Sequence, residues 1–241
     1  MFVGTLIGVF LRRRLPENHV TSDSRDVIKL GAGLIATLAA LVLGLLVSSS
    51  KSAFDAVNDA VIGGAASRVL LDRTLAHYGP EANGARAQLR EALTARIDRL
   101  WPKRNARAGG EVRADEKASD MEAVGDTLRN LTPTSEPQRA LKERALALYY
   151  EGNELKWNLD EKAQTQAPAV LVTVLVFWFS LLFAAFAILA PSNPTVHAVM
   201  FLCALSVAGG ILLILEMGRP FEGIIKVPSA PMEDALKNLG R

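Results

Sequence analysis

The stretch DVIKLGAGLIATLAALVLGLLVSSSK, residues 26–51, decides the fold of this chain. Twenty-one residues without a charge separate Lys29 from Lys51. At about 1.5 Å rise per residue they extend about 31 Å as a helix, which matches the ~30 Å hydrocarbon core of a bilayer. A helix of a soluble domain seldom stays apolar on every face over such a length. We therefore predict a membrane helix over residues 28–50.

Small residues recur along one face of this helix, at spacings of four, three, four and four. They are Gly33, Thr37, Ala40, Gly44 and Ser48. If several copies of the chain surround an axis, these are the candidate pore-lining residues, with Lys29 and Lys51 at the pore mouths. Rings of lysine concentrate anions, and an apolar constriction can gate by dewetting.

A simpler interpretation of the same face is close packing between membrane helices, which small residues also favour. In that case both lysines extend to the lipid headgroups and the hydroxyls bond back to their own helix. The sequence leaves both interpretations open.

The composition fits a chain divided between bilayer and water, because 50% of its 241 residues are hydrophobic while 22% are charged. A net charge of +2 provides no broad electrostatic field for nucleic acid. The single cysteine, Cys203, excludes an internal disulfide and dithiol redox chemistry within one chain. The three histidines, His19, His77 and His197, lack metal-ligand spacing, so we predict no metal site and no cofactor.

Two further uncharged stretches, 168–190 and 195–215, are predicted to be membrane helices. The short turn between Pro191 and Pro194 joins them into an antiparallel hairpin. The rest of the chain divides into a partial or truncated first membrane helix, a polar connector, a soluble helical domain and an amphiphilic tail. We place these at residues 1–11, 12–27, 51–167 and 216–241, and expect the tail along the membrane edge or against the soluble helices.

Within the soluble domain, local signals predict where helices begin and end. The helical pattern that follows residue 50 should stop at Tyr78-Gly79-Pro80. Further helices are predicted over 84–100 and around 121–131. Ser135 can cap a next helix, with Gln138 placed for a capping box. A heptad-like seam along that helix indicates packing against a neighbour in the same chain or in another subunit: Leu141, Ala145, Leu148, Gly152, Leu155 and Leu159.

No pattern in the sequence indicates catalysis. The acidic pairs Asp115-Glu116 and Asp160-Glu161 are typical of solvated helix surfaces, where neighbouring carboxylates point apart. Gly31-Ala32-Gly33 begins a membrane helix and lacks the preceding strand that a phosphate-binding loop needs. We therefore predict that the protein is not an enzyme.

Three stretches of the chain resemble the bacterial bestrophin-like domain family: LRRRLPENHVTSDSRDVIKLGAGLIATLAALVLGLLVSSSKSAFD, LLDRTLAHYGPEA and RPFEGIIKVPSAPMEDAL. The family is distantly similar to bestrophins, which are pentameric anion channels. The resemblance implies an all-α membrane protein whose long transmembrane helices extend into a helical soluble domain. Bestrophin pores have a phenylalanine-rich neck on the second membrane helix, whereas this helix presents Gly, Ala, Thr and Ser.

Two functional hypotheses follow. The first is an oligomeric ion channel lined by residues 28–50, with anions as the conducted ions that the resemblance implies. The second is a non-conducting scaffold or sensor, in which the hairpin of residues 169–215 seals the small face and the heptad-like seam or the tail binds a partner. The absence of intramembrane charge argues against a proton-coupled transporter.

The expected partners are the lipid bilayer, further copies of the chain in a homo-oligomer and small inorganic ions, without nucleic acid. We expect a multi-pass protein of the bacterial inner membrane with its soluble domain in the cytoplasm.

Overall fold

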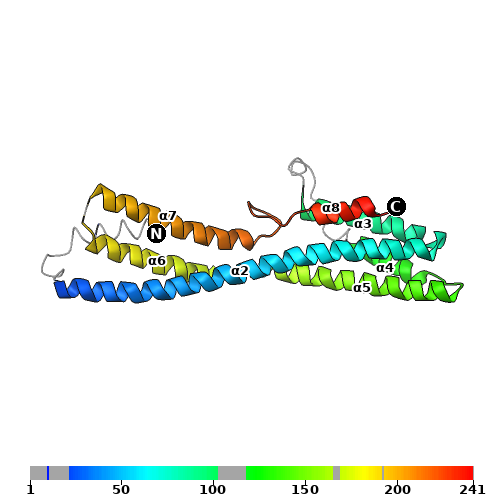
Figure 1. Ribbon diagram of the computed structural model, residues 1–241, viewed down its shortest axis with the longest axis horizontal. Coiled ribbons are helices and arrows are strands. Elements are labelled where there is room, and N and C mark those ends of the chain that lie inside the picture. Colours follow the sequence, from blue (N-terminus) through cyan, green and yellow to red (C-terminus); the bar gives the residue numbers. More distant parts are fainter. Residues whose placement is uncertain (1–9, 11–21, 103–117, 165–168, 192, 241) are drawn as a thin grey trace. The chain divides into compact units, whose positions relative to one another are not determined.

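The computed structural model describes residue 10 and residues 22–102, 118–164, 169–191 and 193–240, and the elements in this part of the chain are helical (Figure 1). The side chains of 118–120 and 155–164 are not part of this description. The predicted segment 1–11, except Phe10, and most of the predicted connector 12–27 lie outside the described residues. The elements are α2 (Ser22–Tyr78), η2 (Pro80–Ala82), α3 (Asn83–Leu100), α4 (Ala118–Asn130), α5 (Glu136–Gln164), α6 (Ala169–Leu189), α7 (Pro194–Met217) and α8 (Ala230–Asn238).

Helices α2, α6 and α7 are long and apolar enough to cross a membrane. Helix α2 has 57 residues, so the uncharged stretch and the charged sequence after it form one uninterrupted helix. It ends at Tyr78, where Gly79 takes a positive φ of 128° that residues with a side chain rarely adopt. The predicted fold class, an all-α membrane protein whose long helices extend into a helical soluble domain, is confirmed.

The chain forms two compact units, and α2 contributes to both. Unit 1 contains Met1–Ala53 and Thr165–Arg219, and unit 2 contains Phe54–Gln164 and Pro220–Arg241. In unit 1 the core joins α2 to α6 and α7. Its buried side chains are Ala32, Ala39, Leu46, Leu175, Phe179, Leu182, Phe183 and Ile214.

The turn between α6 and α7 is closed by Asn193, which caps α7. Its side-chain Oδ1 accepts a hydrogen bond from the backbone N of Val196 at 2.8 Å, and Pro194 follows in the first turn. This arrangement satisfies one of the amide donors that a helix start leaves without a partner.

Unit 2 is built from the second part of α2, from α3, α4 and α5, and from the end of the chain. Helix α5 contributes Ala145, Leu148 and Tyr149 to this core. The largest fully buried side chains come from α2, α3, α4 and the end of the chain: Val57, Val61, Leu75, Leu89, Leu93, Val124, Leu128, Val227, Met232 and Leu239. The segment after Pro220 therefore packs against the soluble helices, one of the two places expected for the tail. Trp101 holds it by donating from Nε1 to the carbonyl oxygen of Val227 at 2.8 Å.

Helix α5 begins as its sequence predicts. The hydroxyl of Ser135 accepts a hydrogen bond from the backbone N of Gln138 at 3.4 Å. The side chain of Gln138 reaches back to Thr134 rather than to Ser135, and its Nε2 also donates to the last carbonyl of α2, at Tyr78, at 3.1 Å. One glutamine therefore connects the start of α5 to the end of α2.

The seam along α5 packs within the same chain. Ala145, Leu148 and Gly152 are buried, and Leu141 packs against the core of unit 2. A Cβ on Gly152 would lie 3.9 Å from the Cβ of Ser67 on α2. The side chains of Leu155 and Leu159 lie outside the described part of α5.

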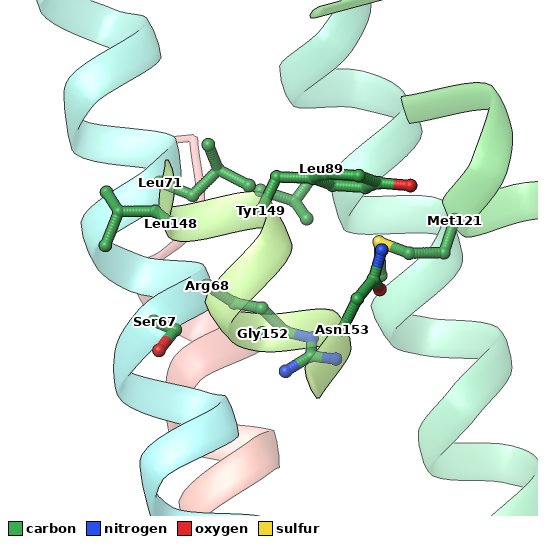
Figure 2. A pocket seen from close by; sticks show the side chains of 9 residues that line it. All are labelled: Ser67, Arg68, Leu71, Leu89, Met121, Leu148, Tyr149, Gly152 and Asn153. Carbon is green, nitrogen blue, oxygen red and sulfur yellow. The ribbon is translucent and has the colours of Figure 1, made fainter. Parts of the chain in front are cut away.

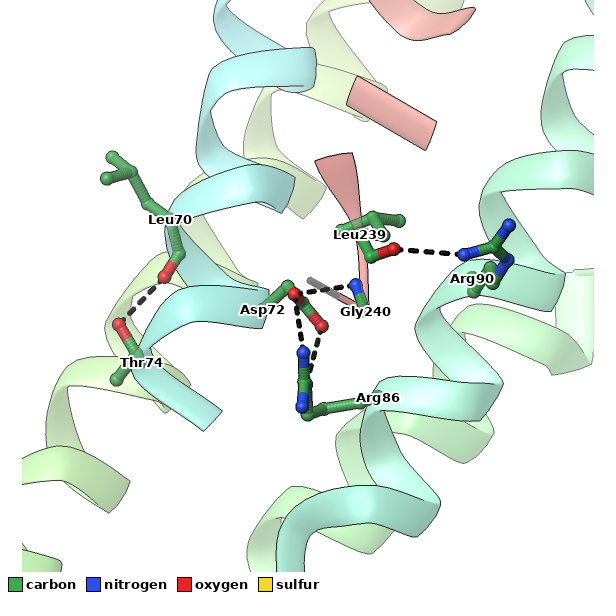
Figure 3. Close-up of polar contacts among 7 residues, drawn as sticks. All are labelled: Leu70, Asp72, Thr74, Arg86, Arg90, Leu239 and Gly240. Carbon is green, nitrogen blue, oxygen red and sulfur yellow. Dashed lines mark hydrogen bonds and ion pairs between the residues drawn. The ribbon is translucent and has the colours of Figure 1, made fainter. Parts of the chain in front are cut away.

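A buried carboxylate ties α2, α3 and the C-terminal residues together (Figure 3). Asp72 is only 1% exposed, and its two oxygens accept hydrogen bonds from Nε and Nη2 of Arg86 at 2.8 and 3.0 Å. The backbone N of Gly240 donates to the same carboxylate at 3.1 Å, while Arg90 donates to the carbonyl of Leu239 at 2.9 Å. The hydrogen bond to Asp72 raises the pKa of Arg86, because it stabilises the charged guanidinium.

Replacing Asp72 by alanine should destabilise unit 2 by about 3 kcal/mol, because it leaves Arg86 and the Gly240 amide without their acceptor in a largely buried place. Urea unfolding of the full chain in detergent measures this loss, followed by the fluorescence of Trp101 in a background where Trp157 and Trp178 are replaced by phenylalanine. The control is Asp98→Ala on the exposed face of α3, which should change the unfolding free energy by less than about 0.5 kcal/mol. Equal losses in the two variants would contradict the role given to Asp72.

Candidate functional site

The uncharged stretch of α2 presents three stripes to its surroundings, which follow from the ~100° turn per residue of an α-helix. One stripe is buried against α6 and α7 in unit 1. Its members are Ala32, Ala39, Leu46 and Ser50, which are at most 8% exposed. The alanines on this stripe let the aromatic side chains of α6, such as Phe179 and Phe183, approach the helix closely.

The small stripe is the set of candidate pore-lining residues, and it lies about 135° from the buried stripe around the helix axis. All five of its members are exposed: Gly33, Thr37, Ala40, Gly44 and Ser48. A Cβ added to Gly33 or Gly44 would meet no other atom within 4 Å. The structure therefore places these residues together on one open face, and the hairpin of α6 and α7 does not seal it.

Gly210 on α7 shows what a glycine at a helix contact looks like in the same unit. A Cβ at this position would lie 3.7 Å from Cδ2 of Leu43 on α2. The glycines of the small stripe have no such neighbour among the described residues. Packing within the described part of one copy therefore does not explain their small size.

Sequence reasoning missed a third stripe, formed by exposed leucines. Its members are Leu30, Leu34, Leu38, Leu41 and Leu45, which are 43–76% exposed. Their spacing of four, four, three and four gives the same helical signal as the small residues, so the stripe could have been found from the sequence. It lies about 90° from the small stripe. Apolar surface of this extent needs lipid or another protein surface to cover it.

The hydroxyl of Thr37 bonds within its own helix. Its Oγ1 donates to the carbonyl oxygen of Gly33 at 2.9 Å, as the simpler interpretation of the sequence expects. The oxygen lone pairs of the hydroxyl are left to accept hydrogen bonds from water or from a second copy. Ser48, the last residue of the small stripe along the chain, is also exposed.

The lysines expected at the pore mouths are both exposed. Lys29 pairs with Asp26, with 3.0 Å between its Nζ and Oδ1 of the carboxylate. This pair lowers the positive field that Lys29 alone would produce, although an exposed pair contributes at most about 1 kcal/mol to stability. Lys29 is therefore a weaker anion attractor than its place in the sequence indicates.

The described residues contain no group of three or more His, Cys, Asp or Glu side chains that could hold a metal ion. Of the acidic pairs in the sequence, Asp115 and Glu116 lie outside the described residues. The side chains of Asp160 and Glu161 lie outside them as well.

A family model described as Bestrophin-like domain matches residues 1–232. Two crystal structures of a bacterial bestrophin homolog from Klebsiella pneumoniae, one of them a point variant, are similar to the chain. The variant is 16% identical to this chain with a TM-score of 0.68, and the match covers 98% of this chain and 96% of the variant. The other structure is 17% identical with a TM-score of 0.68, and the match covers 99% of this chain and 96% of that structure. The crystal structure of a membrane protein variant is 17% identical with a TM-score of 0.71, covering 99% and 95%. At these identities the likeness shows the fold. No curated protein matches the chain.

The neighbouring residues Ala39 and Ala40 provide a matched test of the stripes, because Ala39 is fully buried and Ala40 is exposed. Ala39→Leu should overpack the contact with α6 and α7 and cost about 1–3 kcal/mol, whereas Ala40→Leu should fit without moving any atom of the same copy. Thermal unfolding in detergent, followed by circular dichroism at high dilution, should show a lower midpoint for Ala39→Leu only. Equal midpoints, or a loss confined to Ala40→Leu, would contradict the assignment of the stripes.

Proposed function

We propose that this chain, which belongs to the bestrophin-like domain family, is an oligomeric channel for small inorganic ions. In this proposal the small stripe of α2 lines the pore, and anions are the conducted class that the family resemblance implies. The observation that supports it most directly is that all five residues of the small stripe are exposed in a single copy.

The exposure of the small stripe matters because a face of small residues on a membrane helix calls for a structural explanation. Where they meet another helix, they allow close contact, as Gly210 does with Leu43. The glycines of the small stripe meet no atom of the described residues within 4 Å, so the small size of the stripe fits either a second copy or the wall of a narrow pore. If several copies surround a central axis and α2 faces that axis, the small stripe both lies close to the other copies and lines the pore.

The leucine stripe supports a homo-oligomer. Lipid tails solvate leucine well, so a single stripe of leucine needs no protein partner in a bilayer. Two exposed stripes of different size about 90° apart, however, give α2 one face for the axis and another for a neighbouring subunit. We infer that the leucine stripe packs against the adjacent copy while the small stripe faces the pore.

The scaffold or sensor hypothesis requires that the hairpin of α6 and α7 seal the small face. Gly33 and Gly44 have open space around them instead, so this requirement is not met by the structure of unit 1. The described part of the heptad-like seam and the tail, which that hypothesis reserved for a partner, are used in the core of unit 2. We therefore favour the channel, without enzymatic activity.

The protein is a membrane protein with three candidate spans in its described residues. We propose that it resides in the bacterial inner membrane and that unit 2 lies in the cytoplasm.

Ion flux across liposomes that contain the purified full chain tests the proposal. Wild-type protein should release chloride or potassium under a gradient, and the ratio of the two rates gives the selectivity. Gly44→Leu should reduce the flux about tenfold or more, because a leucine on every subunit narrows and dries the constriction.

Gly209→Leu is the control, since a Cβ at Gly209 on α7 also meets no described atom within 4 Å and the position belongs to neither exposed stripe of α2. It should keep the flux within about twofold of wild type, because Gly209 lies outside the helix that lines the proposed pore. Folding and assembly of each variant are checked by circular dichroism and by size in detergent. An assembled wild type that conducts no ion at any pH or voltage would overturn the channel, and equal effects of the two variants would overturn the assignment of the small stripe.

A further inference from the structure

A small pocket lies in unit 2 between α2, α3, α4 and α5 (Figure 2). Its lining residues with polar side-chain groups are Ser67 and Arg68 on α2 and Tyr149 and Asn153 on α5. The walls are otherwise mainly apolar and include Leu71, Leu89 and Met121. Among the residues described, no carboxylate lines the pocket.

Arg68 is buried in this pocket although it has a charged side chain, and only 5% of it is exposed. Its Nη1 donates to the carbonyl oxygen of Gly64 at 2.6 Å, one turn earlier on α2. Its Nε is buried and has no hydrogen-bond partner among the described residues. A buried N–H group without an acceptor is costly, and in a charged group it is more so.

The glycine before Arg68 explains how the guanidinium reaches this place. A Cβ on Gly64 would lie 2.9 Å from Nη1 of Arg68, which is too close for an undisturbed contact. The absence of a side chain at Gly64 therefore lets Arg68 fold back along α2 and turn its remaining donors toward the pocket. Figure 2 shows the guanidinium next to the side chain of Asn153.

The positive charge of Arg68 has no counter-charge from the nearest acidic position on its helix. Asp72, four residues later, is occupied by Arg86 and by the amide of Gly240. Burial, and then the neighbouring charge of Arg96, lowers the pKa of Arg68 to about 10. Arg68 lies beyond Lys51, outside the uncharged stretch of α2, and at neutral pH it remains protonated.

We propose that this pocket binds a small inorganic anion of halide size. The anion would accept from Nε of Arg68 and from the side-chain amide of Asn153, and it would neutralise a charge that the fold leaves uncompensated. The apolar walls favour a weakly hydrated monovalent anion over phosphate or a carboxylic acid. The site lies in unit 2 and does not involve the small stripe, so it is independent of ion conduction.

Thermal unfolding of the full chain in detergent tests this site, with sodium gluconate replaced by sodium bromide at constant ionic strength. Gluconate is too large for the pocket. In wild-type protein, bromide should raise the unfolding midpoint in a saturable way by about 5 °C, because a ligand that binds only the folded state stabilises it. Bromide also gives anomalous scattering, which should place a peak beside Arg68 in crystals.

Arg68→Met should abolish the effect of bromide, since it removes the donor and the charge. If that variant does not fold, Asn153→Leu serves instead, because it fills the pocket from α5 and should abolish the effect as well. Arg73→Met is the matched control, an exposed arginine five residues along the same helix, and it should keep the full bromide effect. The proposal is overturned if wild type shows no bromide effect, or if the effect persists in Arg68→Met or is lost in Arg73→Met. Because the readout is stability, these outcomes do not depend on whether the protein conducts ions.

Discussion

The structure depends on the requirement that every backbone polar group in a bilayer be bonded within its own segment. Between Lys29 and Lys51 this is met by one helix, and nothing interrupts that helix until Gly79. The same helix therefore contributes Ala39 to the core of unit 1 and Leu75 to the core of unit 2. No loop separates the apolar part of α2 from its soluble part.

Because side-chain direction advances by about 100° per residue, the uncharged stretch of α2 can show different chemistry on each face. Ala39 and Ala40 are adjacent and chemically identical, yet one is buried by the hairpin and the other is open. The small stripe and the leucine stripe beside it are left uncovered by the described residues of one copy. The exposure of the small stripe is the physical reason for proposing an assembly.

Among the described residues of unit 2, the buried charged side chains are Asp72 and Arg68, and their charges are compensated in different ways. Asp72 is surrounded by donors from α3 and from the end of the chain, so burial of its charge is compensated by hydrogen bonds. Arg68, one turn earlier on the same helix, has one carbonyl acceptor and one donor without a partner in the described structure. The use of Asp72 to hold the C-terminal residues leaves Arg68 available for an external anion.

The sequence predicted several helices and some of their ends, because those depend on local signals, but it did not predict the short helix α8 within the tail. The stop at Tyr78-Gly79-Pro80, the cap at Ser135 and the helix predicted over 84–100 all agree with the structure to within a residue. Helical periodicity in the sequence was also enough to group the small residues of α2 on one face. Only the tertiary structure decided which face the hairpin covers, because burial of Ala39 rather than Ala40 depends on where α6 and α7 pack. The same holds for Asp72 and Arg68: Asp72 accepts from Arg86 and Gly240, which are more than ten residues away, and Nε of Arg68 has no partner in the described chain, so no local spacing can indicate either arrangement.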